Sequence, residues 1–177
     1  MLRTILIYGA IAGIGVAIPM FTLLALDRDF NSFGSSAVTG YTLMILALSL
    51  IFVGVKRYRD TAKGGVIKFG QAFLVGLGIS AVAGVIYVIG WETTLVLTNY
   101  SFAADYAQAA IAAAQAKGAS AAEIDALRTQ YAEFERSYAN PLFRLPMTFI
   151  EIFPVGLIIS LIAAALLRNP RFMPARG

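Results

Sequence analysis

The residues best suited to chemistry in this sequence are Glu151 and Pro154, which lie inside a long apolar stretch near the C-terminus. The stretch, residues 146–167, is long enough to cross a bilayer, because a helix rises ~1.5 Å per residue and the hydrocarbon core is roughly 30 Å thick. A carboxyl group that faces acyl chains is costly, so we expect Glu151 to face protein, water or a partner. Pro154 cannot donate to the carbonyl of Ile150, which leaves an acceptor beside the carboxyl group.

The depth of Glu151 suggests which other side chains it meets. If its helix begins near Pro146, Glu151 lies about five residues, roughly 8 Å, inside the outer end. Polar side chains expected at similar depth, or at the mouth of the site, are Thr22, Thr39, Tyr41, Thr42, Tyr87, Glu92 and Arg144. These residues predict a polar cavity in the outer half of a helix bundle. Its carboxyl group either binds a proton, a cation or a substrate amine or hydroxyl, or serves structurally by hydrogen bonding to a tyrosine or threonine.

Enzyme chemistry has little support in the sequence. The chain has no cysteine and no histidine, which are the commonest metal ligands and nucleophile or base partners. The serines lack a nucleophile elbow, no phosphate-binding glycine loop is present, and no apolar segment carries paired carboxylates. We therefore predict a protein that is not an enzyme and that holds no cofactor or metal.

The composition is that of a membrane protein. Hydrophobic residues make up 59% of the 177 residues and charged residues only 14%, against about 45–50% and about 25% in soluble domains. Four apolar runs predict an all-α bundle of four spans in a single transmembrane domain, residues 1–177, with spans at about 5–26, 36–55, 69–91 and 146–167. The first run is too long for the core of a signal peptide, so we interpret it as an uncleaved helix.

Small residues recur at every fourth position in three of these spans. The sets are Gly9 and Gly13; Gly76, Ser80 and Gly84; and Gly156, Ser160 and Ala164. Such stripes let helix backbones approach closely. Whether they pack within one chain or across a dimer is open at this stage.

The segment from about residue 99 to residue 140 is less apolar and predicts a helical hairpin outside the bilayer. Ser120 and Glu123 form a capping-box pattern at the start of its second helix. An apolar stripe follows along one face of that helix: Ile124, Leu127, Tyr131, Phe134 and Tyr138. The stripe is interpreted as the seam between the two hairpin helices or their seat on the bundle, with a docking surface for another protein as the alternative.

The distribution of basic residues predicts the orientation. With four spans, nine of the fourteen Lys and Arg residues fall on the side of both termini. The positive-inside rule then places both termini in the cytoplasm and the hairpin outside. Five of the nine form a cluster that is either a contact for anionic lipid headgroups or only a determinant of topology: Lys56, Arg57, Arg59, Lys63 and Lys68.

Several short runs together resemble a family of small four-span bacterial membrane proteins catalogued as a domain of unknown function. The runs are Gly40-Tyr41-x-x-Met44, Ile51-Phe52-x-Gly54, Tyr58-Arg59-Asp60, Ile67-x-Phe69-Gly70-x-Ala72-Phe73-x-x-Gly76, Ile86-Tyr87 and Glu151-x-x-Pro154-x-Gly156-Leu157. The resemblance covers the four spans and the basic loop, and is weakest in the hairpin. It implies a four-span fold in a bacterial inner membrane and transfers no activity, cofactor or catalytic residue.

Two functional hypotheses follow. The first is a structural or accessory subunit that docks to a larger membrane complex through its small-residue faces or its hairpin. The alternative is a small transporter or permeation-type protein that uses the cavity around Glu151. We favour the first, because one carboxyl group away from the midplane is a poor pathway and no inverted repeat is visible. The expected partners are membrane lipids and other membrane subunits or a second copy, and no nucleic acid.

Overall fold

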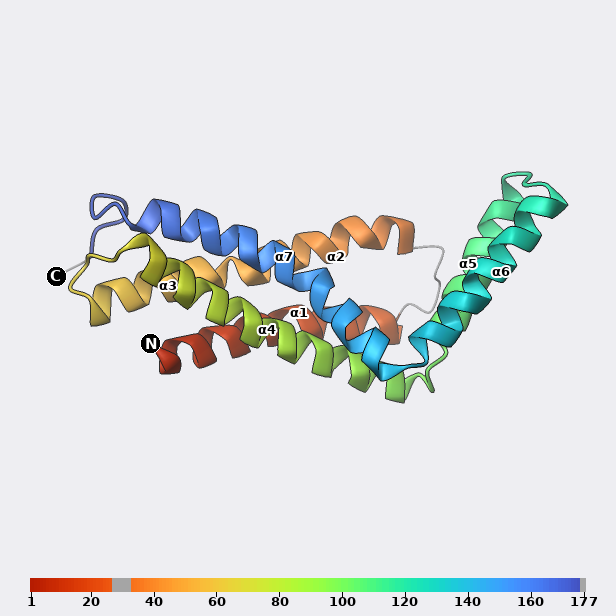
Figure 1. Cartoon of the computed structure of the whole chain (residues 1–177), viewed down its shortest axis with the longest axis horizontal. Coiled ribbons are helices and arrows are strands. Elements are labelled where there is room, and N and C mark those ends of the chain that lie inside the picture. The colour runs from red at the N-terminus through yellow and green to blue at the C-terminus, as the bar shows by residue number, and fades with distance from the viewer. Residues whose placement is uncertain (27–32, 176–177) are drawn as a thin grey trace.

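The computed structural model describes residues 1–26 and 33–175, and every regular element in these ranges is a helix. The helices are α1 (Leu2–Leu26), α2 (Phe33–Leu48), α3 (Leu50–Ala62), α4 (Phe69–Leu97), α5 (Phe102–Ala116), α6 (Ala121–Tyr138) and α7 (Pro141–Leu167). Figure 1 shows a bundle of α1–α4 and α7, with α5 and α6 projecting from one end. The polar loop at residues 27–32 and Arg176 lie outside the described residues.

Four helical stretches in the described part of the chain are long and apolar enough to cross a membrane: Leu2–Pro19, Val38–Ala62, Phe69–Leu97 and Pro141–Leu167. The prediction of an all-α membrane protein with four such helices is therefore confirmed. The N-terminus and the turn between α3 and α4 lie at the end of the bundle opposite to the projecting helices (Figure 1).

The helix boundaries differ from the sequence prediction in three places. The second span is interrupted at Ser49 and then continues to Ala62. Lys56, Arg57 and Arg59 of the basic cluster therefore lie on helix α3 rather than in a loop. The fourth helix of the prediction starts at Pro141 instead of Pro146, because Asn140 caps it by accepting from the Leu142 amide (3.0 Å) and proline is well tolerated at the first helical position. Finally, α4 extends past Trp91 to Leu97.

Small residues hold the bundle together by allowing close approach to α4. A β-carbon added to Gly9 or Gly13 of α1 would lie under 3 Å from side-chain atoms of Val82 or Ile86 on α4. On the other side, a β-carbon at Gly76 or Gly156 would meet the serine of the facing helix. The stripes therefore pack within one chain, which answers the question that the sequence left open.

The contact between α4 and α7 repeats the same pair of residues on both helices. Gly76 of α4 faces Ser160 of α7, and Gly156 of α7 faces Ser80 of α4. Each serine hydroxyl lies within hydrogen-bond distance of the glycine carbonyl four residues earlier, and the Ser80 and Ser160 hydroxyl oxygens are 3.1 Å apart. Both hydroxyls thus have polar partners in a buried contact, as an apolar bundle requires.

The projecting helices α5 and α6 pack on each other through aromatic side chains. The Tyr106 and Tyr131 rings meet edge to face with centroids 5.9 Å apart. Ser120 and Glu123 form a complete capping box at the start of α6, and the Ser120 amide and hydroxyl hold the pKa of the Glu123 carboxyl below its usual value. Between the helices Gly118 has a φ of +80°, a conformation that favours glycine and ends α5.

These contacts predict opposite effects for two Gly→Ala substitutions. At Gly13 the new β-carbon would lie 2.7 Å from Cβ of Ile86 and 2.9 Å from the Ala83 carbonyl oxygen, so we expect overpacking to cost about 1–3 kcal/mol. Gly40 of α2 has no atom within 4 Å of an added β-carbon, so Gly40→Ala is the matched control and should leave stability unchanged or slightly raised. Thermal unfolding in detergent measures both variants, and equal melting temperatures would contradict the proposed packing.

Candidate functional site

Glu151 lies on the surface of the bundle rather than enclosed between three spans. Its side chain is exposed, and Oε2 accepts a hydrogen bond from the hydroxyl of Tyr87 on α4 at 3.2 Å. Tyr87 itself is only 1% exposed. The buried face of α7 includes Thr148, Ile152 and Gly156, one residue out of phase with Glu151. Because successive helical residues are turned by about 100°, Glu151 lies at the edge of the packed face, where it still reaches Tyr87 of α4.

Among the other residues of the predicted cavity, Tyr87 is the one that the described structure shows bonded to Glu151. Tyr41 is 49% exposed on α2, although it lies near enough to Tyr87 to interact electrostatically. The hydroxyls of Thr22 and Thr42 donate to the carbonyls of Ile18 and Val38 on their own helices. The contact between Glu151 and Tyr87, with Tyr41 near Tyr87, is the part of the predicted site that the hydrogen bonds of the described residues support. Glu151 also lies ten residues from the start of α7 rather than about five, since this helix begins at Pro141.

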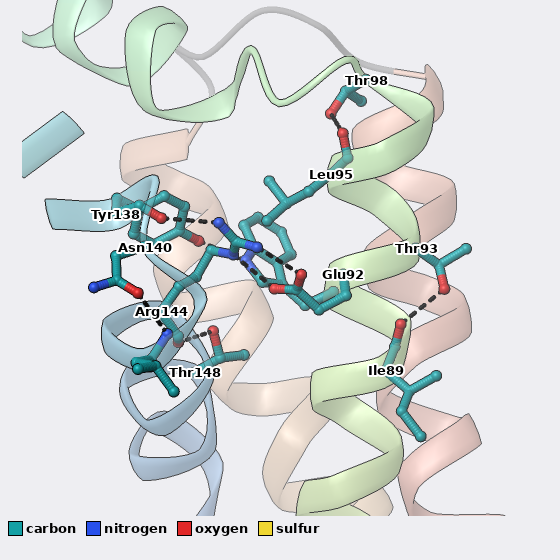
Figure 2. A network of polar contacts seen from close by, with 11 residues as sticks. Ile89, Glu92, Thr93, Leu95, Thr98, Tyr138, Asn140, Arg144 and Thr148 are labelled. Carbon is teal, nitrogen blue, oxygen red and sulfur yellow. Dashed lines mark hydrogen bonds and ion pairs between the residues drawn. The ribbon is translucent and has the colours of Figure 1, made fainter. Parts of the chain in front are cut away.

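Glu92 instead forms an ion pair with Arg144, at the junction where α4, α6 and α7 meet (Figure 2). Nε and Nη2 of Arg144 donate to the two carboxylate oxygens of Glu92, each at 2.7 Å. Nη1 donates to the backbone carbonyl of Tyr138 at 2.9 Å. Arg144 is 4% exposed and the Glu92 side chain 26% exposed. A two-pronged pair of this kind fixes both position and direction of the arginine.

Aromatic rings complete this junction. The Arg144 guanidinium carbon lies 5.4 Å from the centroid of the Tyr100 ring and 5.7 Å from that of Tyr138, within cation–π range. Trp91 donates its indole N–H to the Tyr138 hydroxyl and packs edge to face on Phe102. Burial raises the pKa of Tyr138, so this phenol stays neutral. We call Trp91, Glu92, Tyr100, Tyr138 and Arg144 the hairpin junction.

The local chain path explains how the junction forms. After α4, Asn99 and Tyr100 both adopt positive φ values (52° and 56°), which turn the chain sharply toward α5. For a tyrosine this conformation is strained. The contact of its ring with Arg144 and the bond from its amide to the Leu95 carbonyl (2.7 Å) offset the strain.

At the opposite end of the bundle, Arg59 is fully buried and holds the C-terminal segment. Nη1 donates to the Phe172 carbonyl at 2.9 Å, Nη2 to the Met173 carbonyl, and Nε to Asp60 at 2.7 Å. The Phe172 ring packs edge to face on Phe52. Arg59 is therefore not available to lipid headgroups, in contrast to the sequence prediction for the basic cluster.

The remaining members of the basic cluster differ in exposure. Arg57, Lys63 and Lys68 are exposed and stay candidates for contact with anionic headgroups. Lys56 is half-buried and bonds to Asp60, on which the Arg59 side chain also converges. Sequence reasoning missed the clamp on the C-terminal segment, because no local pattern links Arg59 to carbonyls more than a hundred residues away.

The described residues contain no group of three or more Asp or Glu side chains placed to hold a metal ion. Side chains of different helices are joined by hydrogen bonds or ion pairs at Glu92–Arg144, Tyr87–Glu151, Trp91–Tyr138 and Ser80–Ser160. The most developed of these sites is the hairpin junction.

The junction predicts a specific loss when Arg144 alone is replaced. Arg144→Met leaves the partly buried Glu92 without its ion-pair partner, so we expect a loss of about 1–3 kcal/mol and faster hydrogen exchange in α5 and α6. Replacing both residues, Glu92→Met with Arg144→Met, removes the unpaired charge and should recover part of the stability.

The matched control is Arg128→Met. Arg128 and Asp125 form an ion pair on α6 whose side chains are 60% and 79% exposed, and such pairs contribute little. Hydrogen exchange of α5 and α6, together with Trp91 fluorescence, follows all three variants. A loss for Arg144→Met no larger than for Arg128→Met would show that the junction does not hold the hairpin.

Comparisons with known proteins agree with this architecture. No curated protein and no solved structure matches the chain. The profile of DUF4199, a family described as proteins of unknown function, matches residues 7–169. This range includes most of α1 and all of α2 to α7. The chain therefore belongs to the DUF4199 family of proteins of unknown function.

Proposed function

We propose that this protein is a docking subunit of the bacterial inner membrane, which binds a partner through the hairpin formed by α5 and α6. The observation that carries the proposal is the hairpin junction. A buried arginine that contacts α4, α6 and a turn residue fixes the direction in which the hairpin leaves the bundle. A rigidly directed projection is suited to presenting a surface, because less conformational freedom is lost when a partner binds.

The surface of the hairpin supports binding in an aqueous space. Helix α6 carries exposed charged side chains over most of its circumference: Glu123, Asp125, Arg128, Glu133, Glu135 and Arg136. The exposed residues of α5 are mostly alanine and glutamine, including Gln108, Ala112, Ala113 and Gln115. An alanine-rich helix lets another helix approach closely, while the flanking charges select among partners.

The small-residue stripes no longer serve as docking surfaces in this proposal. They are occupied by contacts of α1 and α7 with α4, so docking through them would compete with the fold. The transporter hypothesis depended on a polar cavity around Glu151. Thr42 donates to the Val38 carbonyl of its own helix and Glu92 pairs with Arg144, so neither residue is bonded to Glu151. Of the two docking surfaces expected from the sequence, the small-residue faces and the hairpin, we therefore propose the hairpin.

Orientation belongs to the same proposal. The basic residues Arg57, Lys63 and Lys68 lie around the α3–α4 turn, at the end of the bundle opposite to the hairpin (Figure 1). We infer from the positive-inside rule that this end and both termini are cytoplasmic and that the hairpin lies outside.

Single-cysteine labelling tests the orientation, since the chain has no cysteine of its own. Cysteine at Gln130 on α6 should react with a membrane-impermeant maleimide in intact spheroplasts. Cysteine at Lys63 should react only after the membrane is opened. The reverse pattern would overturn the orientation, and with it the outer location of the hairpin.

Site-specific photocrosslinking in native membranes tests docking. A photoreactive residue at Gln108 or Gln130, both exposed on the hairpin, should yield one discrete adduct in stoichiometric yield. The same residue at Val85, which is 53% exposed on α4, is the control and should not yield that adduct. Arg144→Met should reduce the yield, because the hairpin loses its fixed direction. No discrete adduct from either hairpin position would contradict the proposal.

A further inference from the structure

A regular stripe of exposed residues runs along α7, roughly opposite to its buried residues, with Glu151 at the edge that reaches Tyr87 of α4. Its members, all exposed, are Met147, Glu151, Pro154, Ile158, Leu161 and Ala165. The steps between them alternate between four and three residues, which is the spacing of a heptad seam between paired helices. We call these six residues the α7 seam.

The α7 seam is distinct from the face that holds the bundle together. The packed face carries Ile152, Gly156 and Ser160, which are buried and spaced by four residues. The α7 seam lies on roughly the opposite side of the helix, about 180° from these three residues on average, and is apolar except for Glu151. In paired helices, one polar residue at a single seam position sets the register and the number of helices.

In a single chain, the carboxyl group of Glu151 on this seam has unused capacity for hydrogen bonds. Its Oε2 is held by the Tyr87 hydroxyl, and no further hydrogen bond to the carboxyl group is found among the described residues. The carbonyl of Ile150 is an additional acceptor, because Pro154 has no N–H to give it. Exposed to acyl chains these groups would be costly, so the surface requires a partner that supplies hydrogen bonds at this depth.

We propose that the α7 seam is a parallel dimer interface, occupied by the α7 seam of a second copy of this chain. A second copy inserts in the same orientation, so its Glu151 lies at the same depth and a two-fold axis along the membrane normal brings the two together. A protonated carboxyl group both donates and accepts a hydrogen bond, so two copies complement each other. The proposal is independent of the hairpin and of its partner.

Oxidative crosslinking in native membranes tests the dimer. A cysteine at Ile158, two helical turns from Glu151 on the α7 seam, should crosslink to a species of twice the chain mass. A cysteine at Val85 of α4 is the matched control, because the two positions are similarly exposed (57% and 53%). It should crosslink far less.

Variants at Glu151 in the Ile158→Cys background separate the carboxyl group from general apolar contact. Glu151→Gln keeps a donor and an acceptor and should retain the crosslink. Glu151→Leu removes them and should weaken the dimer by roughly fivefold to thirtyfold, as for the loss of an interhelical hydrogen bond in a membrane. Fluorescence of Trp91 reports that each variant keeps its fold.

Three results would overturn the proposal. The first is an Ile158→Cys crosslink no stronger than that of Val85→Cys. The second is an undiminished crosslink in a folded Glu151→Leu variant. The third is an adduct of Ile158→Cys with a different protein in place of the doubled chain.

Discussion

The ion pair between Arg144 and Glu92 is the interaction on which the shape of the molecule depends. It joins the start of α7 to the end of α4, and through the Tyr138 carbonyl it also holds the end of α6. An ion pair withdrawn from water is tolerated only when its geometry is good and further hydrogen bonds satisfy both groups. Here the Arg144 guanidinium donates to three oxygen atoms and lies near two aromatic rings. Because three helices meet at one side chain, the hairpin has a defined direction rather than hanging from two flexible turns.

Different interactions hold the helices together in the middle of the bundle and near its ends. In the middle, glycine and serine let α1 and α7 approach α4, and close packing replaces the hydrophobic effect, which acts weakly between helices in lipid. Near the ends, the two buried charged side chains among the described residues, Arg59 and Arg144, bind backbone carbonyls and carboxylates. Placing the arginines near helix ends keeps the charges away from the centre of the bilayer, where their cost is highest.

The sequence contained enough information for the helices and their contacts, but not for the polar site. Residue type and four-residue spacing located the spans and the stripes, because these depend on local pattern. Glu151 was placed inside the bundle from its cost in lipid alone. The phase of the stripe through Gly156 and Ser160, extended backward, falls on Ile152 and Thr148 and already puts Glu151 off the packed face. By contrast, the bond from Arg59 to the Phe172 carbonyl joins distant parts of the chain and leaves no local pattern.

The helix surfaces that are buried inside the bundle cannot bind partners, so a partner must bind one of the remaining surfaces. Helix α4 packs on α1 and α7 through its small residues, so α1 and α4 act mainly as scaffold. Among the described surfaces outside this packing are the hairpin of α5 and α6 and the outward face of α7. They differ in chemistry, since the first carries charges suited to water and the second is apolar apart from one carboxyl group. We thus propose one partner in the aqueous phase and one in the lipid, with the Arg144 junction fixing the geometry between the two surfaces.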